Sequence, residues 1–252
     1  MSSSTAPFEL DTPTTLCVAF ALSFMPIAYL LGTFLIPSTQ TRNRLLFYWH
    51  AYDALTHLFI EGSFLYECFT SYAILPSGFT IEPAFLGFKD RAYGAAYGGA
   101  APSARLWQEY AKADRRWATA DATVVSLELL TVFLGGPAAV YVCYLLWASS
   151  RESKSSASAS TQGKGAAKGT LWLVATALAT AELYGGFMTF APEWLTGSPG
   201  LETGNAVYLW FYLVFFNTLW VWIPLWVLWE AGKEVRSAFV AAEGVDGKRK
   251  TK

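Results

Sequence analysis

The sequence predicts an all-α integral membrane protein in which five transmembrane helices form a bundle with an intramembrane pocket. The first observation is composition: 54% of the 252 residues are hydrophobic and only 15% are charged, against about 25% charged residues in soluble domains. The second is a set of five apolar runs, each reaching the roughly 20 residues that cross a bilayer as a helix. This composition excludes a disordered chain, a charged coiled coil and a basic nucleic-acid-binding domain.

The predicted spans are residues 15–36, 45–75, 122–147, 170–191 and 207–229. Lipid offers no hydrogen-bond partner to an open backbone, so each span is expected to be a helix. The first span is interpreted as a retained helix rather than a signal peptide. Residues 1–38 contain no Lys or Arg, and the run is long enough to cross the membrane.

The predicted organisation has three parts. An N-terminal segment with the first helix covers residues 1–39, helices two to five form a catalytic bundle over residues 40–232, and residues 233–252 form a basic tail. Within the bundle we expect a long loop at 76–118. The linker at 150–169 is rich in Ser, Ala, Gly and Lys, and we expect it to be mobile.

Lysines and arginines set the predicted orientation. Twelve of the 18 lie on one side of the predicted membrane, and the other six all lie in the long loop. We therefore expect a non-cytoplasmic N-terminus and a cytoplasmic C-terminus. The last five residues, KRKTK, are similar to the dilysine retrieval signal of endoplasmic-reticulum membrane proteins. This similarity predicts the endoplasmic-reticulum membrane, with the N-terminus in the lumen.

Polar side chains within the spans are the candidate functional groups, because each Asp, Lys or Arg costs about 2.5–3.5 kcal/mol to insert. In the second span Asp53, His57 and Glu61 are spaced four residues apart, which places them on one face of a helix. The candidates in the later spans are Glu128, Thr131, Glu182, Asn217 and Trp220. Several ionisable groups at similar depth predict one shared polar pocket.

Structural interpretations compete with this hypothesis. A lone buried histidine is more often a hydrogen-bonded core residue, but Glu61 one turn from His57 favours a functional pair. Glu128 could bond a neighbouring helix, Asn217 could hold two helices together, and Glu182 is ambiguous. Packing or interfacial roles are expected for His50, Asp53, Glu67, Trp222 and the cysteines Cys17, Cys68 and Cys143.

The motifs of other chemistries are missing from the sequence. We expect no metal, because HExxH does not occur and only one histidine lies deep in a span. Nucleophilic catalysis is disfavoured, because neither GxSxG nor a Cys–His pair occurs. An imidazole and a carboxyl group in one pocket can donate a proton at one carbon and remove one at another. Trp220 could face a positive charge through its ring, and an apolar substrate could enter from the bilayer.

Five sequence motifs resemble the emopamil-binding protein family, the 3-β-hydroxysteroid Δ8,Δ7-isomerases of the EXPERA superfamily. They are HLFIEG at 57–62, LWQEYAKADRRW at 106–117, DATVVSLELLTVFLGGP at 121–137, YGG at 184–186 and VYLWFYLVFFNTLWVWIP at 207–224. The resemblance implies five transmembrane helices. It also implies a reaction without cofactor or metal, in which the sterol double bond moves from C8–C9 to C7–C8.

The resemblance also implies residue roles. A proton adds at C9, a carbocation forms at C8, and the C7 proton leaves. His57, polarised by Glu61, is the expected donor, and Glu128 is the expected base or balances the cation; donor and acceptor could be exchanged. Trp220 would stabilise the cation, and Asn217 would orient a carboxylate or the histidine. Further substrate contacts are expected from Thr131, Asp53, Tyr110, Asp121, Tyr184 and Tyr212.

Three departures from the family pattern leave the substrate open. Ser63 stands where an aromatic residue is frequent, Gly186 replaces an acid, and the loop over 76–104 is longer and rich in Gly and Ala. A related isomerase of a non-sterol terpenoid and a non-catalytic sterol or amphiphile binder are therefore the alternatives. The expected partners are a sterol or terpenoid substrate, cationic amphiphilic amines as inhibitors, membrane lipid and a second copy in a homodimer. Nucleic acid is not expected.

Overall fold

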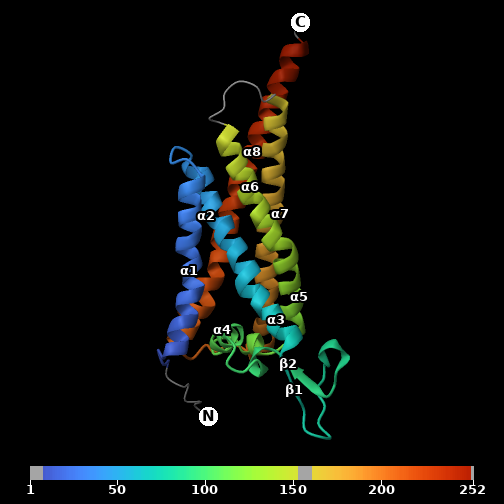
Figure 1. Cartoon of the computed structure of the whole chain (residues 1–252). Helices are drawn as coiled ribbons and strands as arrows, with labels where there is room; N and C mark the ends of the chain where they lie inside the picture. Colours follow the sequence, from blue (N-terminus) through green and yellow to red (C-terminus); the bar gives the residue numbers. More distant parts are fainter. Residues whose placement is uncertain (1–7, 153–160, 251–252) are drawn as a thin grey trace.

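A computed structural model describes residues 8–152 and 161–250 and shows an elongated bundle of long helices (Figure 1). Four helical segments are long and apolar enough to cross a membrane: Thr12–Leu35, Ala122–Arg151, Gly165–Thr196 and Tyr208–Glu243. The predicted helical architecture and multi-pass membrane character are therefore confirmed. The only strands in the described residues form one short hairpin.

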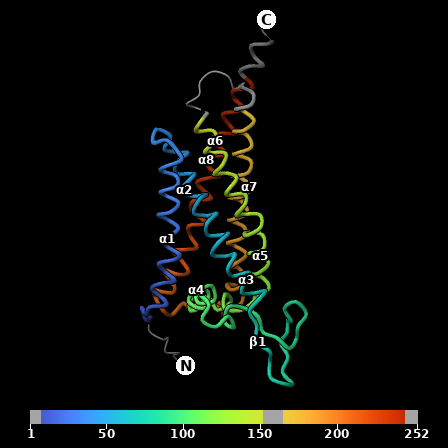
Figure 2. Tube along the Cα trace, in the orientation of Figure 1, coloured from blue at the N-terminus to red at the C-terminus, as the bar shows by residue number. Residues whose placement is uncertain are grey.

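The second predicted span is a single long helix built from three segments. These are α2 (Thr41–Leu55), the π-helical turn η1 (Thr56–Glu61) and α3 (Gly62–Thr70), and the Cα trace runs through them without a break (Figure 2). This helix is not among the four segments assigned to the membrane by length and hydropathy, and it carries several polar and charged residues. The total of five membrane spans thus stays a prediction.

The remaining long helices follow in chain order. The first is α1 (Thr12–Leu35), where the Asp11 side chain accepts the Thr14 amide hydrogen at 2.8 Å and begins the helix as an N-cap. Next come α5 (Ala122–Leu130), the π turn η5 (Thr131–Gly135) and α6 (Gly136–Glu152), which continue one another. The bundle ends with α7 (Thr161–Thr196), the π turn η6 (Tyr208–Phe215) and α8 (Phe216–Lys250).

Helix α2 occupies the centre of the bundle, because it packs against α1 on one side and α6 on another. Helix α6 in turn contacts α7, and α7 contacts α8. Large apolar side chains fill the space between them, including Leu46, Trp49, Leu146 and Val227, which are each at most 5% exposed. The polar face of the second span therefore points into the bundle.

The long loop is folded, which corrects the second predicted boundary. Helix α3 ends at Thr70 rather than Leu75, because β1 (Tyr72–Ile74) pairs antiparallel with β2 (Arg91–Tyr93). The short 3-10 turns η2 (Phe85–Gly87) and η3 (Ala95–Tyr97) flank β2, and α4 (Pro102–Tyr110) and η4 (Arg115–Ala118) follow. These elements cover the end of the bundle where α1 begins (Figure 1).

Two other predicted boundaries change. Residues 150–152 and 161–169 belong to α6 and α7, so the described part of the linker predicted at 150–169 is helical, and its mobility stays a prediction. Its residues 153–160 lie outside the described residues. The predicted basic tail continues α8 as a helix to Lys250. Ala, Glu and Lys are strong helix formers, and they are frequent in the tail.

Candidate functional site

The candidate residues lie at three π-helical turns inside the bundle. His57 and Glu61 are part of η1, Thr131 begins η5 one turn after Glu128, and η6 ends just before Asn217. A π turn inserts one residue into a helix and is frequent at functional sites, because it turns the following side chains toward a new direction. Sequence spacing alone did not predict these turns.

His57 lies between two carboxylates of its own helix. Its Nε2 is 3.0 Å from Asp53 Oδ1, and its Nδ1 is 2.5 Å from Glu61 Oε2. The imidazole is only 3% exposed, and Asp53 is fully buried. When each ring nitrogen faces a carboxylate oxygen, the doubly protonated imidazolium satisfies both contacts at once. The arrangement therefore holds a proton within an apolar environment.

Trp220 connects Asp53 to the aromatic side chains of the site. Its indole Nε1 donates to Asp53 Oδ1 at 2.7 Å, and its ring centroid lies 6.4 Å from the His57 ring. Trp49 and Tyr52 pack around the same indole at centroid separations of 5.5 and 5.7 Å. The structure thus gives Trp220 a hydrogen-bonding role, which the sequence reasoning did not foresee, in addition to a ring face near the histidine.

Glu128 approaches the opposite side of His57. Thr131 donates to Glu128 Oε2 at 2.8 Å, and the Glu128 carboxyl group approaches that of Glu61 closely enough for the two to share a proton. A hydrogen bond between two carboxyl groups needs a proton on one of them. His57, Glu61 and Glu128 therefore form a continuous chain along which a proton can be held at several positions.

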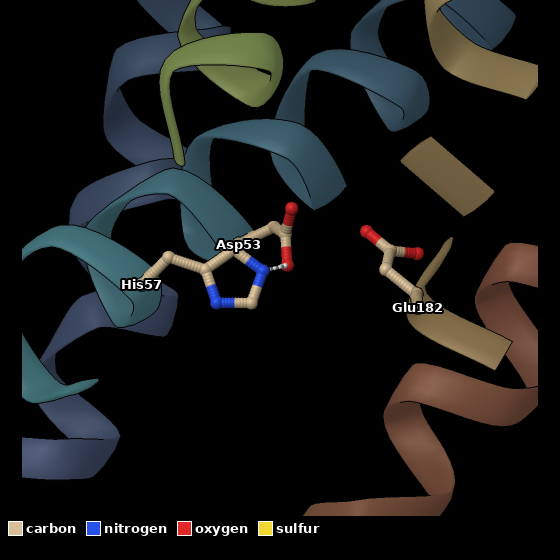
Figure 3. A group of neighbouring side chains, drawn as sticks. All are labelled: Asp53, His57 and Glu182. Carbon is tan, nitrogen blue, oxygen red and sulfur yellow. Dashed lines mark ion pairs between the residues drawn. The ribbon is translucent and has the colours of Figure 1, made fainter. Parts of the chain in front are cut away.

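Glu182 extends this chain on the other side. The sequence left this residue ambiguous, whereas the structure places its carboxyl group opposite Asp53 (Figure 3). The side chain comes from α7 and is buried, no donor group among the described residues reaches its oxygens, and its carboxyl group approaches that of Asp53. Asp53, which we interpreted as a packing or interfacial residue or a substrate contact, is thus a central member of the cluster.

Asn217 belongs to a neighbouring polar group instead of contacting His57. Its Nδ2 donates to the carbonyl oxygens of Tyr212 and Leu213 at 3.2 and 2.8 Å, and to the Tyr110 hydroxyl at 3.1 Å. Burial raises the pKa of the Tyr110 phenol, which keeps its proton available for hydrogen bonding. Asn217 satisfies carbonyl groups that the π turn η6 leaves free, so it has a structural role in this state.

Glu109 is a buried charged residue that the sequence reasoning missed. It accepts hydrogen bonds from Tyr212 and Thr14, each at 2.9 Å, and pairs with Lys112 at 2.5 Å. These contacts join α1, α4 and η6 at the loop end of the bundle. The sequence contained an indication of a role for Glu109, because this residue lies in the LWQEYAKADRRW motif. An acidic residue in a loop is, however, ordinarily expected to face solvent.

Other predicted residues lie away from His57. Asp121 caps α5 by accepting the amide hydrogens of Thr123 and Val124 at 3.0 Å, and Tyr184 is 66% exposed on α7. Glu67, expected to be interfacial, is buried and accepts from two serines. Ser63 accepts the indole hydrogen of Trp107 at 2.9 Å, so this departure from the family pattern anchors the loop to α3.

Two cavities lie away from the His57 cluster. One of about 630 Å³ opens between Thr39–Asn43 and α7, and another of about 420 Å³ lies under the hairpin loop. Neither is lined by His57, Glu61 or Glu128. The predicted intramembrane pocket therefore remains a prediction.

Comparison with known proteins identifies the relatives of the chain. The sequence pattern of the EXPERA (EXPanded EBP superfamily) family matches residues 102–231. The 3-beta-hydroxysteroid-Delta(8),Delta(7)-isomerase of Cavia porcellus is 28% identical over 79% of this chain and 68% of its own length. The Mus musculus protein of the same name is 28% identical over 92% of this chain and 84% of its own. Isomeliandiol synthase MOI2 of Melia azedarach is 25% identical over 83% of this chain and 76% of its own length.

Proposed function

The chain belongs to the EXPERA family, and on that premise we propose that it is a sterol Δ8–Δ7 isomerase. Two of its relatives carry that name. The observation that carries the proposal is the buried imidazole of His57, which has a carboxylate on each ring nitrogen and a third carboxyl group beyond Glu61. This arrangement can hold one proton for delivery and leave another position free to receive one.

The proposed reaction conserves atoms and electrons. His57 delivers a proton to C9 of the substrate, and the C8–C9 π electrons form the new C9–H bond, which leaves a cation at C8. Glu128 removes the C7 proton, and those bonding electrons close the C7–C8 double bond. Glu61 then passes a proton between Glu128 and His57, because it contacts both, so the site is restored after each turnover.

Stabilisation of the cation is the second requirement. The carboxylates of Asp53 and Glu61 place negative charge beside the ring of His57, and the Trp220 ring face lies within the same cluster. In an apolar medium such fixed charges act more strongly than in water. Because His57 and Asp53 are buried, we propose that substrate entry from the bilayer separates α2 from α7 or α8.

Incubation of purified protein with a Δ8 sterol in deuterated water tests the proposal. We expect a Δ7 product that carries one deuterium at C9. His57→Ala and Glu128→Gln should each lower kcat by about 10²–10⁴-fold, the usual contribution of a general acid or base. Tyr144→Phe is the matched control, because Tyr144 is 53% exposed on α6 and lies outside the predicted site. Absence of the Δ7 product from a folded preparation would refute the sterol assignment.

A non-sterol terpenoid is the second candidate substrate. It is favoured by the relatives named isomeliandiol synthase and protoglabretal synthase, which are 25% and 24% identical to this chain. The same proton transfers would move a double bond in a related polycyclic skeleton. Rescue of a sterol-isomerase-deficient yeast at normal sterol levels would refute this alternative. Saturable sterol binding without turnover would instead support a non-catalytic binder.

We also propose the cellular context predicted from the sequence: an endoplasmic-reticulum membrane protein with a lumenal N-terminus and a cytoplasmic C-terminus. Positively charged amphiphilic amines are expected to inhibit it, because a protonated amine resembles the C8 cation. Association into a homodimer is expected through the membrane helices. Protease protection of tagged termini, amine competition and cross-linking in intact membranes test these three points separately.

A further inference from the structure

The side of His57 that faces α7 carries more ligand atoms than the proposed isomerisation uses. One oxygen or nitrogen from each of Asp53, His57 and Glu182 lies within 4.8 Å of the others (Figure 3). Asp53 Oδ2 and both Glu182 oxygens have no hydrogen-bond partner among the described residues. The exposed fractions are 0% for Asp53, 3% for His57 and 8% for Glu182.

Three unpartnered carboxylate oxygens in a buried cluster need an explanation. Buried polar groups are nearly always bonded, and a buried carboxylate without a donor or cation is strongly unfavourable. Two elements supply these groups, α2 and α7, so the arrangement is not a consequence of neighbouring positions in one helix. The free oxygens point to a bound cation between the two helices.

We propose that Asp53, His57 and Glu182 form a site for a divalent transition-metal ion, with Zn²⁺ the best match. One imidazole nitrogen and two carboxylate oxygens are ligand types that Zn²⁺ accepts, and open zinc sites likewise have three protein ligands. A divalent cation neutralises two carboxylates, so the occupied site carries no net charge on these groups. A fourth position stays open for water.

The groups around these ligands support the assignment. A metal-binding histidine usually donates its other ring N–H to a carboxylate, and a ligating carboxylate is itself hydrogen-bonded. Glu61 accepts at His57 Nδ1 at 2.5 Å, which leaves Nε2 to face Asp53 and a metal. Trp220 donates to Asp53 Oδ1 at 2.7 Å and fixes that carboxylate. Both supporting contacts are thus already in place.

The distances require only a small movement. Tetrahedral Zn²⁺ with bonds of about 2.0–2.2 Å holds neighbouring ligand atoms about 3.3–3.5 Å apart. The His57–Asp53 separation is 3.0 Å, and the widest separation in the group is at most 4.8 Å. A rotamer adjustment of Glu182, whose carboxyl group accepts from no donor among the described residues, brings the third ligand to the metal.

Metal binding can be measured independently of catalysis. The full-length protein, free of histidine tags and treated with chelator, is reconstituted in lipid nanodiscs and titrated with Co²⁺ as a spectroscopic substitute for Zn²⁺. We expect visible absorption bands that saturate at one Co²⁺ per chain and disappear when Zn²⁺ is added. Glu61→Gln should weaken binding by about 10–100-fold, the usual effect of removing an outer-shell partner.

Variants identify the ligands. Asp53→Asn and Glu182→Gln, which change shape little, should each weaken Co²⁺ binding at least 100-fold, whereas His50→Gln should retain it. His50 is the other buried histidine, and its Nδ1 is 2.7 Å from the Leu46 carbonyl oxygen. Wild-type protein that binds less than one tenth equivalent of Co²⁺, or Glu182→Gln binding as tightly as wild type, overturns the proposal.

A functional consequence follows if the chain is the proposed isomerase. A metal on Nε2 blocks one of the two ring nitrogens, so micromolar Zn²⁺ should inhibit turnover and a chelator should restore it. Co²⁺ binding without any isomerase activity would refute the proposed function and leave the metal site intact. Isomerase activity without Co²⁺ binding would refute the metal site and leave the proposed function intact.

Discussion

Trp220→Phe tests whether the hydrogen bond to Asp53 holds the buried cluster together. The substitution keeps an aromatic ring among Trp49, Tyr52 and His57 but removes the Nε1 donor, which lies 2.7 Å from Asp53 Oδ1. A hydrogen bond to a charged group contributes about 1.5–3 kcal/mol. We therefore expect the free energy of unfolding to fall by that amount, since Asp53 is fully buried and no solvent replaces the donor.

Denaturant titration in mixed micelles, followed by circular dichroism, provides the measurement. The Asp53→Ala background supplies the control, because it removes the acceptor. In that background Trp220→Phe should cost less than about 0.5 kcal/mol, which gives a coupling of at least 1 kcal/mol between the two residues. Equal costs of Trp220→Phe in both backgrounds would show that the indole hydrogen bond contributes nothing, and the reasoning would fail.

Three further predictions follow from the same contacts. Glu61→Gln should lower kcat by about 10²-fold or more because it alters the partner of His57 Nδ1, with unchanged circular dichroism as the check on folding. Asn217→Leu should destabilise the protein by about 1–3 kcal/mol because carbonyl groups at η6 lose their donor; a cost below 0.5 kcal/mol contradicts this role. Tyr212→Phe removes the 2.9 Å bond to buried Glu109 and should cost about 1.5–3 kcal/mol, whereas Tyr184→Phe, on an exposed surface, should stay within about 0.5 kcal/mol.

The sequence predicted the helices of the bundle because their signal is local. An apolar run of sufficient length needs no information from the rest of the chain, and four segments meet that requirement in the structure. The second span was predicted as another apolar run, and the four-residue spacing of its polar residues placed them on one helix face whatever surrounds them. Helix ends were predicted less well. Helix α3 ends at Thr70 because the chain turns to pair β1 with β2. The partner strand lies about 20 residues later, so the residues around Thr70 do not indicate this pairing.

The site residues likewise fall into those that the sequence placed together and those that only the tertiary structure brings together. His57, Asp53 and Glu61 were grouped correctly because they lie on one helix. The approach of Glu128 and Glu182 depends on how α5 and α7 pack against α2, which no local spacing encodes. Asn217 was expected near the histidine, but the π turn η6 directs its amide to backbone carbonyls and Tyr110. Asp121 was expected to contact substrate and serves as a helix cap.

The sequence alone determined the membrane character, the helices and the acid–base chemistry available on the second span. Each of these follows from composition or from a period within one helix, where the physical interaction is between near neighbours. Only the tertiary structure decided which carboxyl groups meet His57, that Trp220 donates to Asp53, and that Glu182 faces Asp53 with its oxygens free. Those contacts come from different helices, and close packing of large side chains fixes their relative rotation and depth.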